Sequence, residues 1–166
     1  DAIYYAADSG AAVINLSLSM NDTSMIVAAA MEYARSKGAT VYAPAGNTSP
    51  EGVLFPPSYD PSIFKGPVPL LPADWVPSAD SVKAVASIDN DLHKADFSAW
   101  GPEVDLVTPG VSIYGAMPGG GYAWWSGTSM STAVASGVGS LLDSVGGVDL
   151  GAHGGAPGVL KVTGSS

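Results

Sequence analysis

The chain has 166 residues, of which 46% are hydrophobic and 13% charged, a composition that describes a globular domain and excludes a disordered one. Its net charge of −9, with only six lysines and arginines, argues against the clustered basic surface that a nucleic-acid backbone requires. The lack of cysteine excludes disulfides and thiolate metal sites, and no apolar run approaches the ~20 residues of a membrane span. We expect one domain with a sizeable core.

The beginning of the chain already has a helical pattern. Its first nine residues place Ile3, Ala6 and Ala7 on one face and end before Gly10, a residue that favours the end of a helix. Residue 1 is Asp, and no signal peptide or tag is recognisable. We therefore expect the chain to be a piece of a longer polypeptide whose N-terminal part is missing.

Strand and helix patterns alternate through the rest of the chain. Short apolar runs predict strands at residues 12–19, 39–45, 82–88 and 104–107. A helix that is capped by Asp22, Thr23 or Ser24 is expected after the first strand, and another over residues 129–142. This order, with continuous apolar strands, indicates an α/β fold in which helices cover a buried parallel sheet.

The final predicted helix has an apolar face. Its members recur three and four residues apart, which is the spacing of one side of a helix. They are Met130, Ala133, Val134, Gly137, Val138, Leu141 and Leu142.

Two stretches lack such periodicity. Residues 49–81 hold eight of the thirteen prolines, and a loop of this length is usually functional or a surface insertion, of which we favour the insertion. Residues 144–166 hold seven glycines and no apolar period, so we expect a poorly ordered tail.

The run Gly-Thr-Ser-Met-Ser at 127–131 leads from a glycine- and aromatic-rich loop into the final helix. It places the Ser129 hydroxyl at the first turn, where unpaired N–H groups and the positive end of the helix dipole face outward. Such a terminus suits a nucleophile that develops and shares negative charge. Taken alone, however, Ser129 is more often a helix cap.

A second candidate lies at the end of the strand at 39–45. Ligands of open parallel sheets bind beyond the carboxyl ends of strands, where Asn47 stands. Its neutral amide can donate to an oxyanion, and together with the backbone N–H of Ser129 it would form a two-donor oxyanion hole. The alternative is that Asn47 follows Gly46 only to turn the chain.

Four segments in this order resemble the subtilisin-like serine proteases. They are Val-Ile-Asn-Leu-Ser-Leu at 13–18, Ala-Gly-Asn at 45–47, Phe-Ser-Ala-Trp-Gly-Pro at 97–102 through Thr-Pro-Gly-Val at 108–111, and Gly-Thr-Ser-Met-Ser at 127–131. The resemblance implies a three-layer, mostly parallel sheet with helices on both faces, incomplete at its N-terminal side. Residues 1–143 would be the C-terminal half of a peptidase domain.

The resemblance also assigns roles to individual residues. It implies that Ser129 is the nucleophile and Asn47 the side-chain oxyanion donor, and that Gly127 and Thr128 of the serine motif are among the substrate-binding residues. The edge segment whose backbone pairs with an extended peptide would be Ser17, Leu18 and Ser19. One wall of the pocket for the residue before the cut bond would be Ala43, Pro44, Ala45 and Gly46.

The sequence departs from the family in its missing base. The family's aspartate and histidine normally precede a segment like residues 1–10, so they are absent here, and we interpret His93 and His153 as solvated loop residues. Ser19 and Met20 replace a Gly-Gly pair, and Thr-Ala-Val at 132–134 replaces the usual Ser-Pro-His. We expect a serine endopeptidase half that is nearly inactive alone, or alternatively a non-catalytic peptide- or partner-binding module of the same fold.

No metal site is predicted from spacing. Five carboxylates lack the order of a calcium loop and are interpreted as solvated surface: Asp60, Asp74, Asp80, Asp89 and Asp91. Calcium is implied only by the family resemblance, as is an extracellular location. The expected partners are a peptide or protein substrate and the missing N-terminal half of the domain, with no nucleic acid and no membrane.

Overall fold

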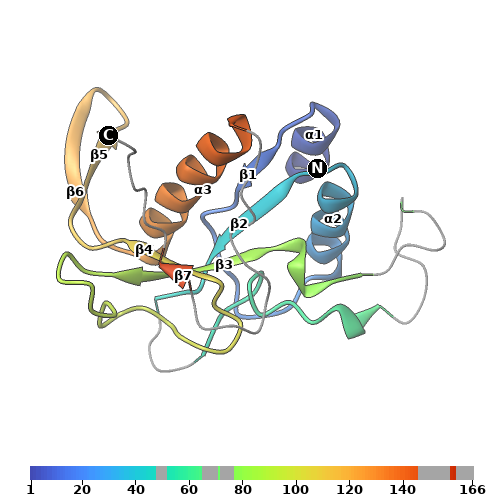
Figure 1. The fold of residues 1–166 in the computed structure, drawn as a ribbon, viewed down its shortest axis with the longest axis horizontal. Coiled ribbons are helices and arrows are strands. Elements are labelled where there is room, and N and C mark those ends of the chain that lie inside the picture. Colours follow the sequence, from blue (N-terminus) through green and yellow to red (C-terminus); the bar gives the residue numbers. More distant parts are fainter. Residues whose placement is uncertain (48–51, 65–70, 72–76, 146–157, 160–166) are drawn as a thin grey trace.

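The computed structural model describes residues 1–47, 52–64, 71, 77–145 and 158–159 (Figure 1). Its main sheet has the strand order β1-β2-β3-β4-β7, and all four pairings are parallel. The strands are β1 (Val13–Asn15), β2 (Thr40–Pro44), β3 (Lys83–Ile88), β4 (Leu106–Pro109) and β7 (Gly158–Val159). The expected α/β fold with a parallel sheet is therefore confirmed.

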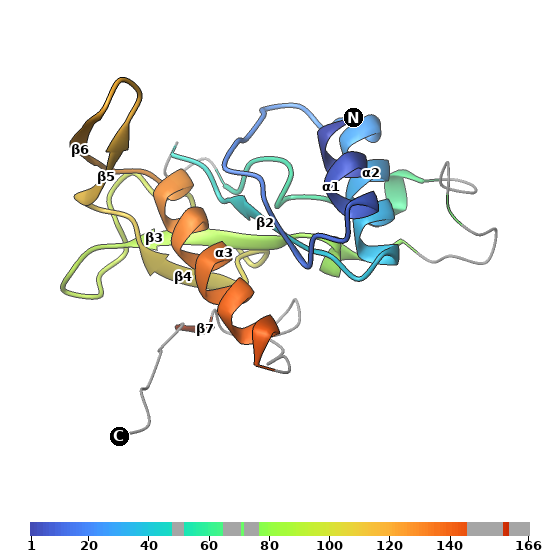
Figure 2. The same ribbon diagram turned by 90° about the horizontal axis from the view of Figure 1, so that it is seen from above.

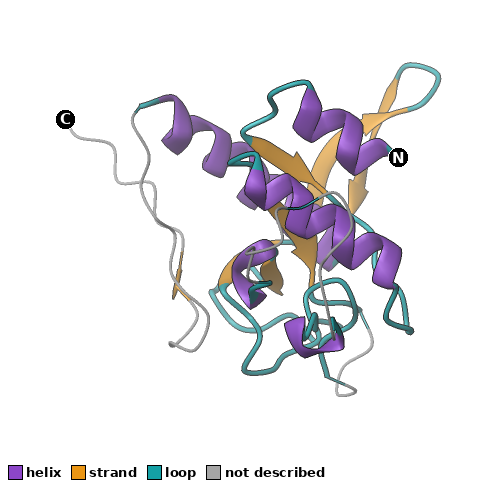
Figure 3. Ribbon diagram, turned by 90° about the vertical axis from the view of Figure 1, so that its right-hand side faces the viewer, coloured by secondary structure: helices purple, strands orange, loops and turns teal. Residues whose placement is uncertain are grey.

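Helices cover both faces of this sheet (Figure 1, Figure 3). Because side chains alternate along a strand, Val41 and Ala43 of β2 join the core under α1 (Ala2–Asp8) and α2 (Met25–Ser36). Between them Tyr42 faces the other way and packs with Ala135 of α3 (Thr128–Ser144). The arrangement is three layers, with α3 alone on its face among the described helices.

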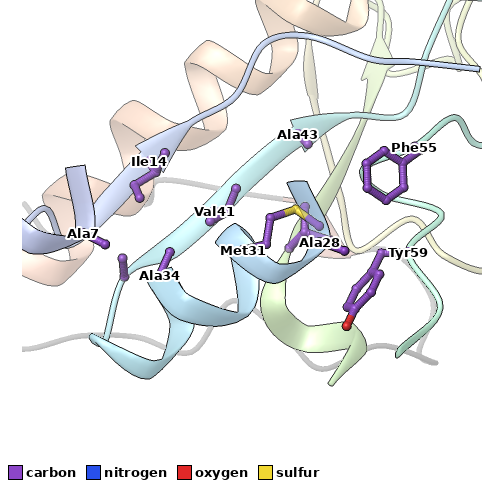
Figure 4. Packing of buried hydrophobic residues seen from close by; sticks show 11 residues of the cluster. Ala7, Ile14, Ala28, Met31, Ala34, Val41, Ala43, Phe55 and Tyr59 are labelled. Atoms are coloured by element: carbon purple, nitrogen blue, oxygen red, sulfur yellow. The ribbon is translucent and has the colours of Figure 1, made fainter. Parts of the chain in front are cut away.

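The core between α2 and the sheet is built largely from alanine, with one large flexible side chain at its centre (Figure 4). Met31 is fully buried there, and alanines at 28 and 34 are also inaccessible. Small side chains let α2 approach the sheet closely, while an unbranched methionine fills the remaining space. The helix begins at Ser24, whose Oγ accepts the Val27 N–H at 3.4 Å, one of the three caps predicted.

The predicted apolar face of α3 is largely not the face that packs on the sheet. The residues buried in α3 are small and mostly polar: Thr128, Ser131, Thr132, Ala135, Ser136 and Gly139. The apolar members Ala133, Gly137 and Leu141 are exposed instead, Leu141 by 66%. The physical reason is close approach, because a Cβ on Gly139 would stand 2.8 Å from Cζ of Tyr42.

A β-hairpin stands where only a loop was expected. Strand β5 (Ile113–Met117) pairs antiparallel with β6 (Gly121–Trp125), and the hairpin projects beside the start of α3 (Figure 2). Its turn uses Gly119 and Gly120 at φ +88° and +84°, a conformation that other residues rarely adopt. The glycine-rich composition of this turn conceals the strands on either side.

Part of the proline-rich stretch belongs to the core. Phe55 and Tyr59 are only 2% and 4% exposed, and the described portion also contains two short 3₁₀ helices, η1 (Pro61–Ile63) and η2 (Ala79–Ser81). The assignment of residues 49–81 as an insertion stays a prediction. Of the expected tail, residues 146–157 and 160–166 lie outside the described residues, as do His153 and Asp74.

Across the ranges that the structure describes, no helix combines the length and the apolar character that a bilayer crossing demands.

Candidate active site

The start of α3 is fixed to the end of β4. Gly127 donates its N–H to the Gly110 carbonyl at 2.8 Å, and Thr108 and Ser131 exchange hydroxyl-to-carbonyl hydrogen bonds of 2.7 and 3.1 Å. The contact is tight, because a Cβ on Gly110 would overlap the Ser131 hydroxyl. Ser129, the second residue of α3, is thereby held at a rigid position beyond the carboxyl end of β4.

Ser129 contacts the predicted peptide-binding edge directly. Its Oγ donates to the Ser17 carbonyl at 3.1 Å, and the Ser17 Oγ donates back to the Ser129 carbonyl at 3.0 Å. Ser17 is further held by Asn15, whose Oδ1 lies 3.0 Å from the Ser17 Oγ and 3.1 Å from the Ser136 Oγ. The sequence alone indicates no such role for Asn15, because its partner Ser136 lies on α3, 121 residues away along the chain.

Asn47 reaches the same helix terminus from β2. Its Oδ1 accepts hydrogen bonds from both the backbone N–H and the hydroxyl of Thr128, each at 2.9 Å. The Thr128 hydroxyl also accepts the N–H of Gly46 at 3.2 Å. Because Oδ1 is committed to Thr128, the amide nitrogen is left as the outward donor, near Gly127. The structure thus brings Asn47 against the two residues that precede Ser129.

The predicted pocket wall is buried and held by neighbouring loops. Residues 43–46 are all buried, the Ala45 carbonyl accepts the Leu54 N–H at 2.9 Å, and the Gly46 carbonyl accepts the Ala99 N–H at 2.9 Å. Gly46 has φ +113°, and the Leu54 side chain packs on its Cα, where a Cβ would stand 2.8 Å away. By contrast, Leu18 and Ser19 of the edge segment are exposed, as a surface that receives a peptide must be.

Beside Ser129 lies an open pocket of about 680 Å³. It is lined by Ser17 and Ser129, by the β5–β6 hairpin, and by Met130, Ala133 and Val134 of α3. Its lining contains no charged side chain, and it does not include Asn47. The side chains that line it are apolar apart from the hydroxyls of Ser17 and Ser129.

Of the two histidines, only His93 lies within the described residues. His93 is exposed, and its Nδ1 lies 3.7 Å from Asp89 of the same turn. No hydrogen bond within the described ranges joins it to Ser129, and His153 lies outside those ranges.

One group of potential metal ligands occurs among the described residues. The ligand atoms of Asp89, Asp91 and His93 lie within 4.8 Å of one another. The set fits calcium poorly, because that ion takes six to eight oxygen ligands and one of these three is an imidazole. Asp89 Oδ1 is moreover already occupied by the N–H groups of Asp91 and His93, each at 2.9 Å.

Comparison with known proteins assigns the class. The model of the subtilase family, Peptidase S8, matches residues 1–146, so the chain belongs to the subtilase family. The protein is similar to the thermophilic serine proteinase of Bacillus sp. (strain AK1), with 39% identity over 146 residues, 88% of this chain and 31% of the relative. It is also similar to thermitase of Thermoactinomyces vulgaris, with 38% identity over 87% of this chain and 44% of the relative.

The fold gives the same assignment. The solved structure of the prenylagaramide maturation protease PagA matches with a TM-score of 0.69 and 30% identity, covering 87% of this chain and 47% of that one. The predicted family and the subtilisin-like fold are therefore confirmed. The chain spans about a third to a half of the length of these relatives.

Proposed function

We propose that this chain carries the nucleophile and oxyanion half of a serine endopeptidase. Ser129 loses its hydroxyl proton to a base and attacks the peptide carbonyl, and the Asn47 amide and the Ser129 N–H hold the oxyanion of the tetrahedral intermediate. The C–N bond then breaks, the amine leaves with that proton, and water hydrolyses the acyl group from Ser129. The observation that carries the proposal is the contact of Asn47 with Thr128 at 2.9 Å, which brings an amide donor to the turn that presents the serine. Family membership supports the reaction class.

A peptide substrate would lie along Ser17, Leu18 and Ser19, with its backbone adding to this exposed edge. In the free chain the Ser17 carbonyl accepts the Ser129 hydroxyl at 3.1 Å. Residues 43–46 would form the pocket wall for the side chain before the cut bond, and Gly127 and Thr128 would border the reacting carbonyl. These roles come from the family resemblance and agree with the burial and contacts described above.

The base would come from a partner, the N-terminal half of the same domain. Two surfaces of the described chain suit such a partner. Strand β1 is an edge of the sheet, with β2 as its one neighbour in the sheet order, and the apolar side of α3 is open, including Leu141 at 66% exposure. A second half that supplies strands and a helix would cover both surfaces.

Covalent labelling tests the proposal. We expect a fluorophosphonate probe to label the isolated chain very slowly, because loss of the histidine base costs about 10⁶ in turnover in subtilisin. Labelling should become rapid when the chain is co-folded with an N-terminal subtilase half, and Ser129→Ala should abolish it. The matched control is Ser126→Ala, which removes an exposed hydroxyl three residues away. Rapid labelling of the isolated chain, or of its Ser129→Ala variant, would contradict the proposal.

The second candidate is a non-catalytic module that binds extended peptides. It is favoured by the exposed residues Leu18 and Ser19 and by the absence, among the described residues, of a histidine in contact with Ser129. The sequence that precedes Asp1 in the parent gene distinguishes the protease from the binding module. Asp-Thr/Ser-Gly and His-Gly-Thr segments there would support the protease, and a native start near Asp1 would support the module. Secretion, inferred from the family, is tested by the same upstream sequence.

Calcium binding, which rests on the family alone, also stays a prediction. Comparison of the melting temperature with calcium and with a chelator tests it.

A further inference from the structure

A buried carboxylate that the proposed chemistry does not use lies in the middle of α2. The side chain of Glu32 is 0% exposed. Burial of a carboxylate is costly unless hydrogen bonds replace its water. Two donors do so at one oxygen: the Tyr59 hydroxyl and the Ser78 backbone N–H each lie 2.8 Å from Oε1, while Arg35 stands 3.5 Å from Oε2.

These two donors belong to different segments of the chain, the turn at 54–59 and the residue before η2. A single oxygen of Glu32 therefore joins both segments to α2. The ring of Tyr59 is itself 4% exposed, so this junction is part of the core.

From Tyr59 a short series of contacts leads to the groove. The Tyr59 N–H donates to the Pro56 carbonyl at 3.0 Å, and Leu54 donates its N–H to Ala45 at 2.9 Å. The Leu54 side chain packs on Gly46, the residue before Asn47. On the other side, the Phe55 carbonyl accepts the N–H of Met20 at 2.8 Å, directly after the edge segment. Residues 54–59 thus touch both the pocket wall and the peptide-binding edge.

We propose that Glu32 is a positioning residue for the substrate groove, acting through Tyr59 and the turn at 54–59. The carboxylate fixes the turn, the turn fixes Leu54 against Gly46 and Phe55 against Met20, and the wall and the edge of the groove are thereby held at a constant separation. Glu32 does not touch the substrate. The assignment of the groove rests on the proposed function above, but the mechanical link does not.

Amide hydrogen exchange in the full chain measures this link without catalysis. We expect Glu32→Ala to accelerate exchange at Leu54 and Met20 by about tenfold or more, the effect of losing hydrogen bonds to a charged group. Tyr59→Phe should act in the same direction and more weakly, because Ser78 still donates. Glu32→Gln should retain most protection, because its amide oxygen accepts the same two bonds. Amides of β3 serve as the internal reference and should be unchanged.

The chain supplies a matched control in Asp8 and Tyr33. There too a tyrosine hydroxyl donates to a carboxylate, at 2.6 Å, but Asp8 is exposed and the pair lies on α1 and α2 away from the turn at 54–59. Asp8→Ala and Tyr33→Phe should leave exchange at Leu54 and Met20 unchanged. If they accelerate it equally, the effect is general and the proposal is wrong.

Two further results would overturn the proposal. Unchanged exchange at Leu54 and Met20 in Tyr59→Phe would show that the turn needs no anchor at Glu32. A parallel increase at β3 in Glu32→Gln and Tyr59→Phe would show a purely global role. If Glu32→Ala does not fold, the milder variants Glu32→Gln and Tyr59→Phe still test the proposal. Failure of Ser129 to react with any probe would leave the exchange result standing, so the two proposals fail separately.

Discussion

Asn47 acts as a cap for α3 although it lies 81 residues away from its partner. Gly127, at the cap position, offers no side-chain acceptor, so the Asn47 Oδ1 accepts the free N–H of Thr128 in its place. A residue assigned to the oxyanion is therefore also a stabilising residue, and its loss has two separable effects.

We predict that Asn47→Ala lowers the free energy of unfolding of the isolated chain by about 1 kcal/mol, because Thr128 loses its acceptor. Urea denaturation followed by circular dichroism measures this. Asn21→Ala, an exposed loop asparagine, is the control and should be neutral. In a complemented enzyme the same variant should also lose about 10²–10³ in kcat, the contribution of one oxyanion-hole donor. Equal stabilities of the wild type and Asn47→Ala would refute the cap.

Tyr59 gives the chain a predictable loss of stability at alkaline pH. Burial raises its pKa above the ordinary value of 10, and the hydrogen bond to Glu32 and the charge of that carboxylate raise it further. Since the folded pKa is higher than the unfolded one, the stabilisation is complete below pH 10 and falls as pH rises above it. We expect Tyr59→Phe to have a lower free energy of unfolding than the wild type at pH 8. Between about pH 10 and 11 its free energy of unfolding should fall less steeply than that of the wild type. Parallel stability curves for the two proteins would contradict this.

At the scale of the element, α3 has two glycines two positions apart with opposite surroundings. A Cβ on Gly139 would meet the Tyr42 ring, with Cζ at 2.8 Å, whereas a Cβ on Gly137 would meet nothing within 4 Å. We predict that Gly139→Ala destabilises the chain by about 1–3 kcal/mol through overpacking. Gly137→Ala should stabilise it by about 0.5–1 kcal/mol, because alanine is the better helix former. Thermal unfolding of both variants measures the difference, and equal melting temperatures would refute the packing of α3.

The helices and strands also show which features of the fold can be predicted from local sequence patterns. The strands at 39–45 and 82–88 are confirmed to within a residue or so, because continuous apolar runs have few other interpretations. The predicted packing face of α3 was wrong. The space above Tyr42 decides which face of α3 packs on the sheet. Tyr42 belongs to β2, which lies far away from α3 in the sequence. The hairpin at 113–125 was missed because its turn is glycine-rich.

The residues of the candidate site likewise include some that a local sequence motif indicates and some that it does not. Ser129 and Asn47 could be predicted as candidates because each belongs to a short motif at the end of an element, and the structure brings their segments together. Asn15 and Glu32 have no such local signal. Their importance arises from donors on other elements, namely Ser136 for Asn15 and Tyr59 and Ser78 for Glu32. Only a three-dimensional structure shows contacts of this kind.

For the whole molecule, the open side of α3 and the free edge of β1 predict self-association of the isolated chain. We expect sedimentation velocity to show species that grow with concentration. Leu141→Arg should shift them towards the monomer, because it places a charge on the apolar face. The control is Ile26→Arg, which changes a residue that is even more exposed, at 78%, on a helix of the opposite face. A compact monomer at all concentrations would contradict the expectation of a missing half.

The contact between Asn47 and Thr128 also has a kinetic consequence. It joins segments 81 residues apart, so no local event during folding can form it. Closing a loop of this length costs conformational entropy before the contact can contribute any stabilisation. Chains whose contacts mostly join distant residues therefore fold slowly. During folding, the nascent polypeptide therefore brings Asn47 to the start of α3 only when α3 docks on the sheet, and until that moment the proposed oxyanion site is not assembled.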